Sequence, residues 1–299
     1  MNTNTGIMQD QLFRPLNFSA LDDNLSSWEK SKTVIIPVPY DLTASYGTGT
    51  RHGPLAIIEA SSHLELYDDE IKEETASIGI HTLNHVEPLC SSPEKMVERV
   101  EEVVSRVLSS NKLTVILGGE HSITVGAVQA MVNSISDIGV VQFDAHADLR
   151  DTYQGSKYSH ACTGRRIHEI CKLTQVGIRS LSKKEFEFLD ESEIETYFCR
   201  DLFNNENWIN DFIKNLPSHI YVTIDLDVLD PSIMPAVGTP EPGGLGWYNI
   251  TKVLKVLAQE KKILGFDIVE LCPQPTNPAP DFLAAKLCYK LLGYIFYKL

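Results

Sequence analysis

Basic residues are few in this sequence relative to acidic ones. There are 26 lysines and arginines against 40 aspartates and glutamates, so the formal net charge is −14 at pH 7. Such a chain lacks the basic surface that binds nucleic-acid phosphates, and we expect no nucleic-acid partner. The acidic field instead favours the approach of small cationic molecules.

Long apolar runs and cysteine motifs are also missing. No run approaches the roughly 20 apolar residues that cross a bilayer. Met1 to Asp10 have neither the basic start nor the apolar centre of a signal peptide. We therefore expect no membrane association and a cytoplasmic protein. The six cysteines lack CxxC spacing, which predicts reduced, mostly structural thiols. Cys162 is an alternative nucleophile, although burial is the stronger interpretation.

The remaining composition indicates a folded α/β protein. Hydrophobic residues make up 43% and charged residues 22% of the 299 positions, and no linker or repeat interrupts them. Apolar runs alternate with helix-like segments, which is typical of a parallel sheet covered by helices. We predict one domain over residues 1–299, with a polar N-terminal arm at about 1–30. The predicted fold has three layers, α/β/α, around a mostly parallel central sheet.

One predicted strand ends in three potential metal ligands. The segment Asp144-Ala145-His146-Ala147-Asp148 follows an apolar run, Ile138 to Phe143. If the segment stays extended, Asp144, His146 and Asp148 point to the same side, because side chains alternate along a strand. Two carboxylates and an imidazole then converge on one point.

Two further apolar runs end in the same way. Ile220 to Ile224 leads into Asp225 and Asp227, and Thr114 to Leu117 leads through two glycines to His121. An acidic pair after a strand is more often a helix cap or a solvated loop than a ligand set. The combination differs, because four carboxylates in one crevice repel strongly and take up protons unless cations neutralise them. We interpret the set as a metal site.

The other predicted elements surround these strands. We expect strands over Thr33 to Val38, Ser77 to Ile80, Thr174 to Ile178 and Ile263 to Val269. A helix is expected to begin at Pro54 and to carry Leu55, Ile58, Leu64 and Leu66. Further helices are expected over Ser92 to Val107, Thr124 to Val132, Arg165 to Cys171, Lys183 to Leu189, Trp208 to Asn215, Ile250 to Gln259 and Phe282 to Tyr297.

Two irregular segments are expected near the site. The loop Tyr40 to Gly53 is predicted to lie over it. Pro231 to Gly246, rich in proline and glycine, follows the Asp225 pair, and a long loop in a compact domain is usually functional. Ligands of open α/β sheets bind outside the carboxyl ends of the strands, where Glu270 also lies.

Together these segments resemble the ureohydrolases, the arginase and agmatinase family, over roughly Val34 to Leu292. The resemblance implies an arginase-like fold and a homo-oligomer, a trimer or hexamer. The motifs that carry it are Gly118-Gly119-Glu120-His121-Ser122, Asp144-Ala145-His146-Ala147-Asp148, Ser159-His160, Asp225-Leu226-Asp227-Val228-Leu229-Asp230-Pro231, Gly238-Thr239-Pro240 and Gly265-Phe266-Asp267-Ile268-Val269-Glu270.

The resemblance implies two manganese ions (Mn²⁺) per subunit. His121, Asp144, Asp148 and Asp225 would hold one ion, and Asp144, His146, Asp225 and Asp227 the other. Two nitrogen and four oxygen donors suit manganese, whereas a cysteine-rich set would indicate zinc. Two cations about 3.5 to 4 Å apart can share one water and lower its pKa, so that hydroxide forms at neutral pH.

The resemblance also assigns roles around a guanidinium substrate. Glu270 resembles the glutamate that pairs with the guanidinium, a planar cation suited to a carboxylate. His160 resembles the proton shuttle that protonates the departing amine. Thr239 would line the guanidinium pocket. Taken alone, Glu270 would read as an exposed residue at a strand end and His160 as an ordinary surface histidine.

The substrate expected from the resemblance is agmatine, a small cationic guanidine that is cleaved to putrescine and urea, a step of polyamine biosynthesis. Tyr158 to Ile167 is similar to the agmatinase branch, and Arg150 stands where arginases usually carry an asparagine. Guanidinobutyrate or formiminoglutamate are alternatives if Arg150 pairs with a substrate carboxylate, and arginine is a third. A one-metal zinc deacetylase and an inactive metal-binding structural or regulatory homologue are further alternatives.

Overall fold

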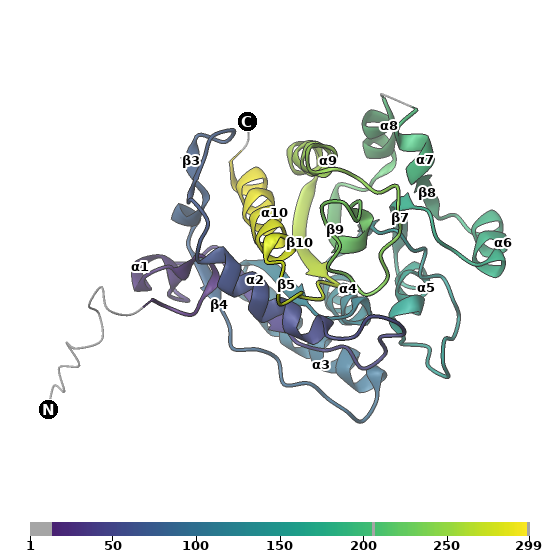
Figure 1. Cartoon of the computed structure of the whole chain (residues 1–299), viewed down its shortest axis with the longest axis horizontal. Helices are drawn as coiled ribbons and strands as arrows, with labels where there is room; N and C mark the ends of the chain where they lie inside the picture. Colours follow the sequence, from purple (N-terminus) through teal and green to yellow (C-terminus); the bar gives the residue numbers. More distant parts are fainter. Residues whose placement is uncertain (1–13, 205–206, 298–299) are drawn as a thin grey trace, which may run out of the picture.

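One parallel sheet forms the centre of the computed structural model, which describes residues 14–204 and 207–297. The eight strands lie in the order β4-β1-β5-β10-β9-β6-β7-β8 (Figure 1). Every pairing within this sheet is parallel. Its strands are β1 (Thr33–Val38), β4 (Ile80–Thr82), β5 (Leu113–Gly118), β6 (Ile138–Phe143), β7 (Lys172–Ile178), β8 (Glu195–Phe198), β9 (His219–Asp225) and β10 (Lys262–Val269).

The central strands are buried on both faces. All residues of β1 and β6 are buried. This is why their sequences are nearly continuous apolar runs, since a parallel sheet is covered by helices on each side. A separate antiparallel pair, β2 (Tyr67–Asp68) and β3 (Glu73–Glu74), lies outside the sheet.

Helices form the outer layers. One apolar cluster joins the sheet to α2 (Gly53–Ser61), α7 (Cys199–Leu202), α8 (Trp208–Asn215), α9 (Trp247–Glu260) and α10 (Ala279–Phe296). A second cluster, on the other face, joins it to α3 (Pro93–Leu108), α4 (Thr124–Ser134), α5 (Thr163–His168) and α6 (Lys183–Glu191). The predicted three-layer α/β/α fold with a parallel sheet is therefore confirmed (Figure 1).

Several element bounds differ from the prediction. The segment expected to be a strand from Ser77 to Ile80 is a 3-10 turn, η3 (Thr75–Ile78), and β4 begins only at Ile80. Helix α2 ends at Ser61, so Leu64 and Leu66 lie beyond it. Helix α5 ends at His168, because β7 already begins at Lys172.

The N-terminal arm is partly structured. Residues 1–13 of the predicted arm lie outside the described part of the chain. The rest contains the 3-10 turn η1 (Phe18–Ala20) and the short helix α1 (Asp23–Ser26). The ring of Phe18 is 0% exposed and packs against α2, and Leu21 is also buried, so these two side chains belong to the apolar core.

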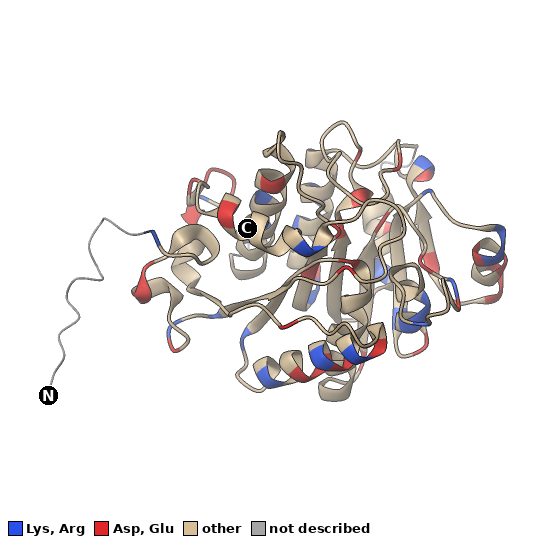
Figure 2. Cartoon of the chain, turned by 60° about the horizontal axis from the view of Figure 1, so that its bottom comes forward, with Lys and Arg blue, Asp and Glu red and all other residues tan. Residues whose placement is uncertain are grey.

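Charges of both signs are spread over the surface. In the view of Figure 2, red and blue segments alternate along the outer helices. Within residues 14–204 and 207–297, no helix is both long and apolar enough to cross a membrane.

A buried ion pair ties the last helix to the β2–β3 pair. Lys290 of α10 donates to both oxygens of Asp68, at 2.9 and 3.1 Å, and Asp68 is 1% exposed. Lys290 also lies 2.9 Å from Glu70. Burial alone raises the pKa of Glu70, but hydrogen bonds from Tyr294, Lys290 and Lys255 outweigh it and lower the pKa to about 2.

We expect Lys290→Met to destabilise the fold, because it leaves Asp68 buried without its cation. Removing one partner of a buried pair costs on the order of 3 kcal/mol of unfolding free energy. Because the folded pKa of Glu70 is depressed, its contribution is present above the unfolded value and is lost as the pH falls toward 2. Denaturant unfolding at pH 7 and at pH 3 measures both effects.

The matched control is Lys286→Met, on the same helix. Lys286 lies over the ring of Tyr289, with 5.6 Å between the ammonium and the ring centre. A contact of this kind contributes less than about 1 kcal/mol when it is exposed. Equal destabilisation by the two substitutions would contradict a special role for the Lys290 pair.

Candidate metal centre

Four neighbouring strands deliver the candidate site. β5, β10, β9 and β6 lie side by side and run parallel, so their carboxyl ends meet at one edge of the sheet. His121 follows β5, Glu270 follows β10, Asp225 ends β9, and Asp144 follows β6. The parallel register thus brings together residues that are up to about half the chain apart.

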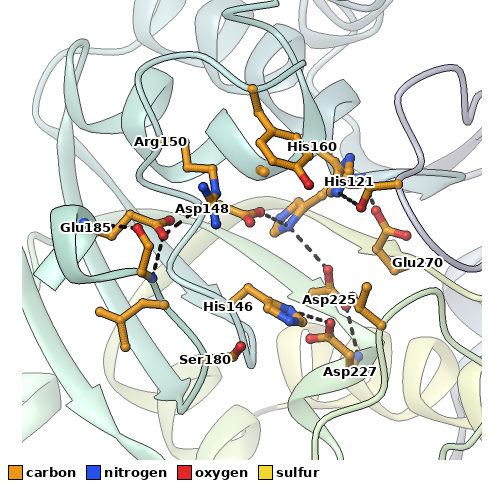
Figure 3. A pocket seen from close by; sticks show the side chains of 16 residues that line it. His121, His146, Asp148, Arg150, His160, Ser180, Glu185, Asp225, Asp227 and Glu270 are labelled. Carbon is orange, nitrogen blue, oxygen red and sulfur yellow. Dashed lines mark hydrogen bonds and ion pairs between the residues drawn. The ribbon is translucent and has the colours of Figure 1, made fainter.

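The six predicted ligands lie together at this edge, and Figure 3 labels five of them, all except Asp144. His121 Nδ1 lies 3.1 Å from Asp144, 3.2 Å from Asp148 and 3.4 Å from Asp225. Two groups share one member, Asp144: the first is His121, Asp144 and Asp225, and the second is Asp144, His146 and Asp227.

The second group contains a shorter contact than any in the first group. His146 Nδ1 lies 2.8 Å from Asp227 and 3.7 Å from Asp144. The side chains of Asp144 and Asp227 are 0% and 2% exposed, whereas that of His146 keeps 24%. His146 is therefore the most exposed of the six candidate ligands.

The ligands do not converge by the route that the sequence suggested. The segment after β6 does not stay extended, because Asp148 adopts a left-handed conformation with φ of 51°. Asp227 lies in a 3-10 turn, η6 (Leu226–Val228), and its backbone N–H donates to the side chain of Asp225 at 2.9 Å. The left-handed backbone of Asp148 costs about 1 to 3 kcal/mol and persists because the surrounding structure holds it.

The electrostatics of the cluster fit divalent cations. Burial, together with Asp148 and Asp227, raises the pKa of Asp144 to about 7. Burial disfavours protonation of His146, but Asp227 outweighs it and raises the pKa to about 11. The raised pKa of Asp144 reflects its burial and the mutual repulsion of the buried carboxylates, which bound cations would relieve. Among the described residues, His121 Nδ1 is a buried atom without a hydrogen-bond partner, which suits a metal ligand.

A buried threonine and a carboxylate fix the ring of His121. Thr223 Oγ1 lies 2.9 Å from His121 Nε2, and its hydroxyl donates to Asp267 at 2.6 Å. The single hydroxyl proton goes to Asp267, so Thr223 accepts from His121 Nε2–H. Nδ1 is then free for a cation, as with histidine ligands in general. Sequence reasoning missed Thr223 and Asp267, although a charged residue inside the apolar β10 run is a usable signal.

Two buried glutamines support Asp144. Gln142 Nε2 donates to Asp144 at 2.7 Å, and Gln175 Nε2 donates to Gln142 at 2.9 Å. Both glutamines are 0% exposed. Sequence reasoning missed them, and their only signal is a polar side chain within an otherwise apolar strand.

An arginine holds the proline-rich loop against the ligands. Arg179 donates to the carbonyl oxygens of Asp227 and Glu241, both at 2.7 Å, and of Pro242, at 3.0 Å. The predicted irregular loop Pro231 to Gly246 contains no helix or strand. Arg179 is a further residue that sequence reasoning missed, and it fixes the turn that carries Asp227.

A cavity of about 300 Å³ opens beside the ligands. Its lining includes the predicted residues Glu270, His160, Thr239 and Arg150. In Figure 3, Glu270 lies on one side of the metal ligands, and Arg150 lies with Glu185 on the other. The cavity therefore has a carboxylate at one end and a paired arginine at the other.

Glu270 is held in a fixed orientation. Its Oε1 accepts the backbone N–H of His121 at 2.7 Å, and its own φ is 68°. Removal from bulk water raises the pKa of Glu270 well above its usual range, and the nearby Glu120 raises it further. A carboxyl group in this position is ready to accept a cationic partner.

Arg150 is already paired at the far end of the cavity. Its Nε lies 3.8 Å from Glu185, and its guanidinium lies over the ring of Tyr153, 4.9 Å from the centre. Glu185 is 5% exposed and accepts the backbone N–H of Leu149 at 3.0 Å. Sequence reasoning missed Glu185, because it begins a helix far from the other motifs.

His160 and Cys162 have different environments. Burial lowers the pKa of His160, so the ring is neutral at pH 7. Burial raises the pKa of Cys162 to about 11, and the thiol lies 3.8 Å from the carbonyl oxygen of Ser156. Cys162 is 0% exposed, which agrees with the structural interpretation of this cysteine.

The fold has three layers around one parallel sheet, and histidine and aspartate side chains meet at the carboxyl edge of that sheet. These features define a class of α/β proteins with a candidate metal centre. A sequence model of the arginase family matches residues 31–293, and the chain belongs to that family. Both predictions made from the motifs, the ureohydrolase family and an agmatinase-like ureohydrolase enzyme, are confirmed.

Named relatives cover nearly the whole chain. An N(1)-aminopropylagmatine ureohydrolase of Synechocystis sp. is 39% identical, over 90% of this chain and 91% of the relative. An agmatinase of Pyrococcus horikoshii is 38% identical, over 87% and 90%. The crystal structure of an agmatine ureohydrolase of Thermoplasma volcanium has a TM-score of 0.86 and 35% identity, over 95% of each chain.

Proposed function

We propose that the protein hydrolyses the guanidinium group of agmatine, giving putrescine and urea, with two manganese ions bound per subunit. The observation that carries this proposal is Glu270, a fixed carboxylate in a cavity that five of the six candidate ligands also line, with the sixth, Asp144, within 4.8 Å of its neighbours in both ligand groups. Only a reaction that needs both a cation-binding carboxylate and bound cations uses the whole arrangement.

The chemistry of the ligands supports manganese. The first ion would be held by His121, Asp144, Asp148 and Asp225, and the second by Asp144, His146, Asp225 and Asp227. Histidine nitrogen and carboxylate oxygen suit manganese, and none of the six is a sulfur ligand. When bound, two divalent cations lower the pKa of a water molecule and so supply a nucleophile at neutral pH.

Glu270 orients the substrate in this proposal. The guanidinium is a planar cation that pairs with a carboxylate through hydrogen bonds, and it would keep Glu270 ionised in spite of its raised pKa. Because the backbone of His121 fixes one oxygen of Glu270, the guanidinium carbon faces the ligand cluster. Thr239 lines the same cavity and is available to a guanidinium N–H.

His160 completes the reaction as the acid. Addition of water to the guanidinium carbon gives a tetrahedral intermediate and releases a proton, which the neutral His160 takes up. His160 then delivers this proton to the departing amine nitrogen as its C–N bond breaks. The products are urea and the amine, so one water is consumed. Because the pKa of His160 is lowered, the imidazolium that forms during the reaction is a ready proton donor at neutral pH.

N(1)-aminopropylagmatine is a second candidate substrate. The relative from Synechocystis sp., 39% identical, carries this activity in its name. The longer tail adds a second ammonium group, which would compete with Arg150 for Glu185 and the ring of Tyr153 in the outer part of the cavity. Hydrolysis of this substrate releases spermidine and urea, which also belongs to polyamine biosynthesis.

The family resemblance supports three further proposals. The chain forms one domain over its 299 residues. It assembles as a homo-oligomer, a trimer or hexamer, and it acts in the cytoplasm. Size-exclusion chromatography with light scattering tests the assembly.

We expect agmatine or its aminopropyl derivative to be hydrolysed with a higher kcat/KM than L-arginine or 4-guanidinobutyrate. Arg150 is paired with Glu185, so a substrate carboxylate must compete with Glu185 for it. The measurement is urea release from the four guanidines at one manganese concentration, since kcat/KM compares competing substrates.

Each other outcome has a defined meaning. A preference for arginine would overturn the agmatinase assignment. A preference for guanidinobutyrate would show that Arg150 binds a substrate carboxylate. Manganese binding without urea from any of the four compounds would favour the non-catalytic alternative.

A further inference from the structure

The ring of His160 is bound at both nitrogens by hydroxyl groups of one loop. Thr43 Oγ1 lies 3.3 Å from Nδ1, and Ser45 Oγ lies 3.3 Å from Nε2. Ser45 lines the cavity, so Nε2 is the nitrogen on the cavity side. Thr43 also accepts the backbone N–H of His160 at 3.0 Å. The loop Tyr40 to Gly53, which the sequence predicted to lie over the site, therefore contacts the proposed acid directly.

Thr43 has a second, stronger partner in Glu120. Its hydroxyl lies 2.7 Å from Glu120 Oε1, and its backbone N–H donates to Oε2 at 2.6 Å. Ser122 Oγ also donates to Oε1, at 2.5 Å. Glu120 is 0% exposed, so these three donors surround a carboxylate that has little contact with water. Nothing in the proposed reaction uses Glu120 otherwise.

The number of protons then decides the state of His160. A hydroxyl has one proton and two lone pairs. If the proton of Thr43 goes to Glu120, both lone pairs face His160, and one accepts the backbone N–H. The other accepts Nδ1–H, so the neutral ring carries its proton on Nδ1 and presents the lone pair of Nε2 to the cavity.

The same arrangement occurs a second time in this site. His121 Nε2 donates to Thr223, and Thr223 donates to Asp267. In each case a threonine lies between a buried carboxylate and one nitrogen of a histidine, and the other nitrogen faces the cavity or the ligand cluster. In both cases the threonine hydroxyl, held by a buried carboxylate, fixes the orientation of a histidine ring.

We propose that Thr43, held by Glu120, is a positioning residue that fixes the orientation and tautomer of His160, so that Nε2 is the atom that exchanges the proton. The proposal rests on the role of His160 as the acid. The imidazolium gives its Nε2 proton to the amine nitrogen as the C–N bond of the substrate breaks. The ring returns to the neutral form with its proton on Nδ1, donated to Thr43.

The test compares Thr43→Val, which removes the hydroxyl and keeps the shape, with Thr43→Ser, which keeps the hydroxyl. Urea release from agmatine with manganese is measured for each. Because well-placed acid–base groups contribute about 100-fold or more, we expect Thr43→Val to lower kcat by roughly 10- to 100-fold, with KM changed little. Thr43→Ser should restore kcat to within about threefold of the parent.

A matched control is Thr163→Val. The hydroxyl of Thr163 donates to the backbone carbonyl of His160 at 2.9 Å and does not touch the ring. We expect its kcat to stay within about threefold of the parent, since the tautomer is unaffected. Manganese content and the melting temperature of each variant show whether it is folded. If Thr43→Val does not fold, Thr43→Ala takes its place.

A double-mutant cycle separates positioning from general damage. In a His160→Asn background, Thr43→Val should cause no further loss of kcat, because residues that act as a unit are not additive. Histidine ring ¹⁵N spectra should show the Nδ1–H tautomer of His160 in the parent and its loss in Thr43→Val, with or without substrate. Additive losses, or an unchanged tautomer, would overturn the proposal. If His160→Asn itself retains full activity, the acid role of His160 fails instead, and the spectra still decide the tautomer.

Discussion

Asp144→Asn should abolish the binding of both manganese ions and, with it, urea release. Asp144 is 0% exposed and is common to the two residue groups that the structure brings together, and the proposed ligand sets of both ions also include it. An amide has no negative charge to offer to either cation. Changes in the groups around metal ligands already cost about 10- to 100-fold in affinity, so we expect more than about 100-fold for a shared ligand.

Elemental analysis after dialysis against manganese measures this effect. The parent should hold about two ions per chain, as a two-metal reaction requires. His146→Ala should hold one, because His146 belongs to the second group only. Asp151→Asn is the control: Asp151 pairs with Arg166 on the surface and should keep both ions. If the Asp144→Asn variant retains two ions, Asp144 is not a ligand shared by both.

Glu270→Gln should fold, bind manganese normally and lose most of its activity. The glutamine oxygen can still accept the backbone N–H of His121, so the local structure has the same hydrogen bond. The neutral amide cannot pair with a guanidinium. Loss of one partner of a desolvated charge pair costs about 2 to 5 kcal/mol, which lowers kcat/KM by roughly 30-fold to several thousand-fold.

The measurement is kcat/KM for agmatine, together with manganese content. Glu241→Gln provides the comparison, because Glu241 also lies near a ligand, 4.0 Å from His146, but its side chain is 37% exposed. Its effect is screened by solvent and should stay below about tenfold. Near-parental kcat/KM in Glu270→Gln would take Glu270 out of the mechanism.

The strands and the candidate ligands could be predicted from the sequence because both have local signals in it. An apolar run predicts a strand buried on both faces, and a polar residue at its end stands out at once. By contrast, β8 is half-buried along its length at the edge of the sheet, so Glu195 to Phe198 shows no apolar run. It was not predicted for that reason.

The contacts that orient the ligands have no local signal. Thr43 and Glu120 are 77 residues apart, and His121 and Thr223 are 102 apart. Such pairs arise only when the whole sheet is assembled. The left-handed conformation of Asp148 is likewise set by its surroundings, since nothing in its own sequence requires it. Sequence reasoning therefore named the residues that meet at this edge of the sheet but mistook how they converge.

The position of β10 has a consequence for the synthesis of the chain. It is the last strand to be made, yet it lies between β5 and β9 in the middle of the sheet. Before residues 262–269 leave the ribosome, β4-β1-β5 and β9-β6-β7-β8 are two separate pieces, each with an unpaired edge. Open edges of this kind attract other nascent chains. His121 belongs to the first piece and Asp144 to the second, so a chain that stops before β10 has no joined metal centre. A premature stop codon late in the gene thus leaves an aggregation-prone fragment rather than a weakened enzyme.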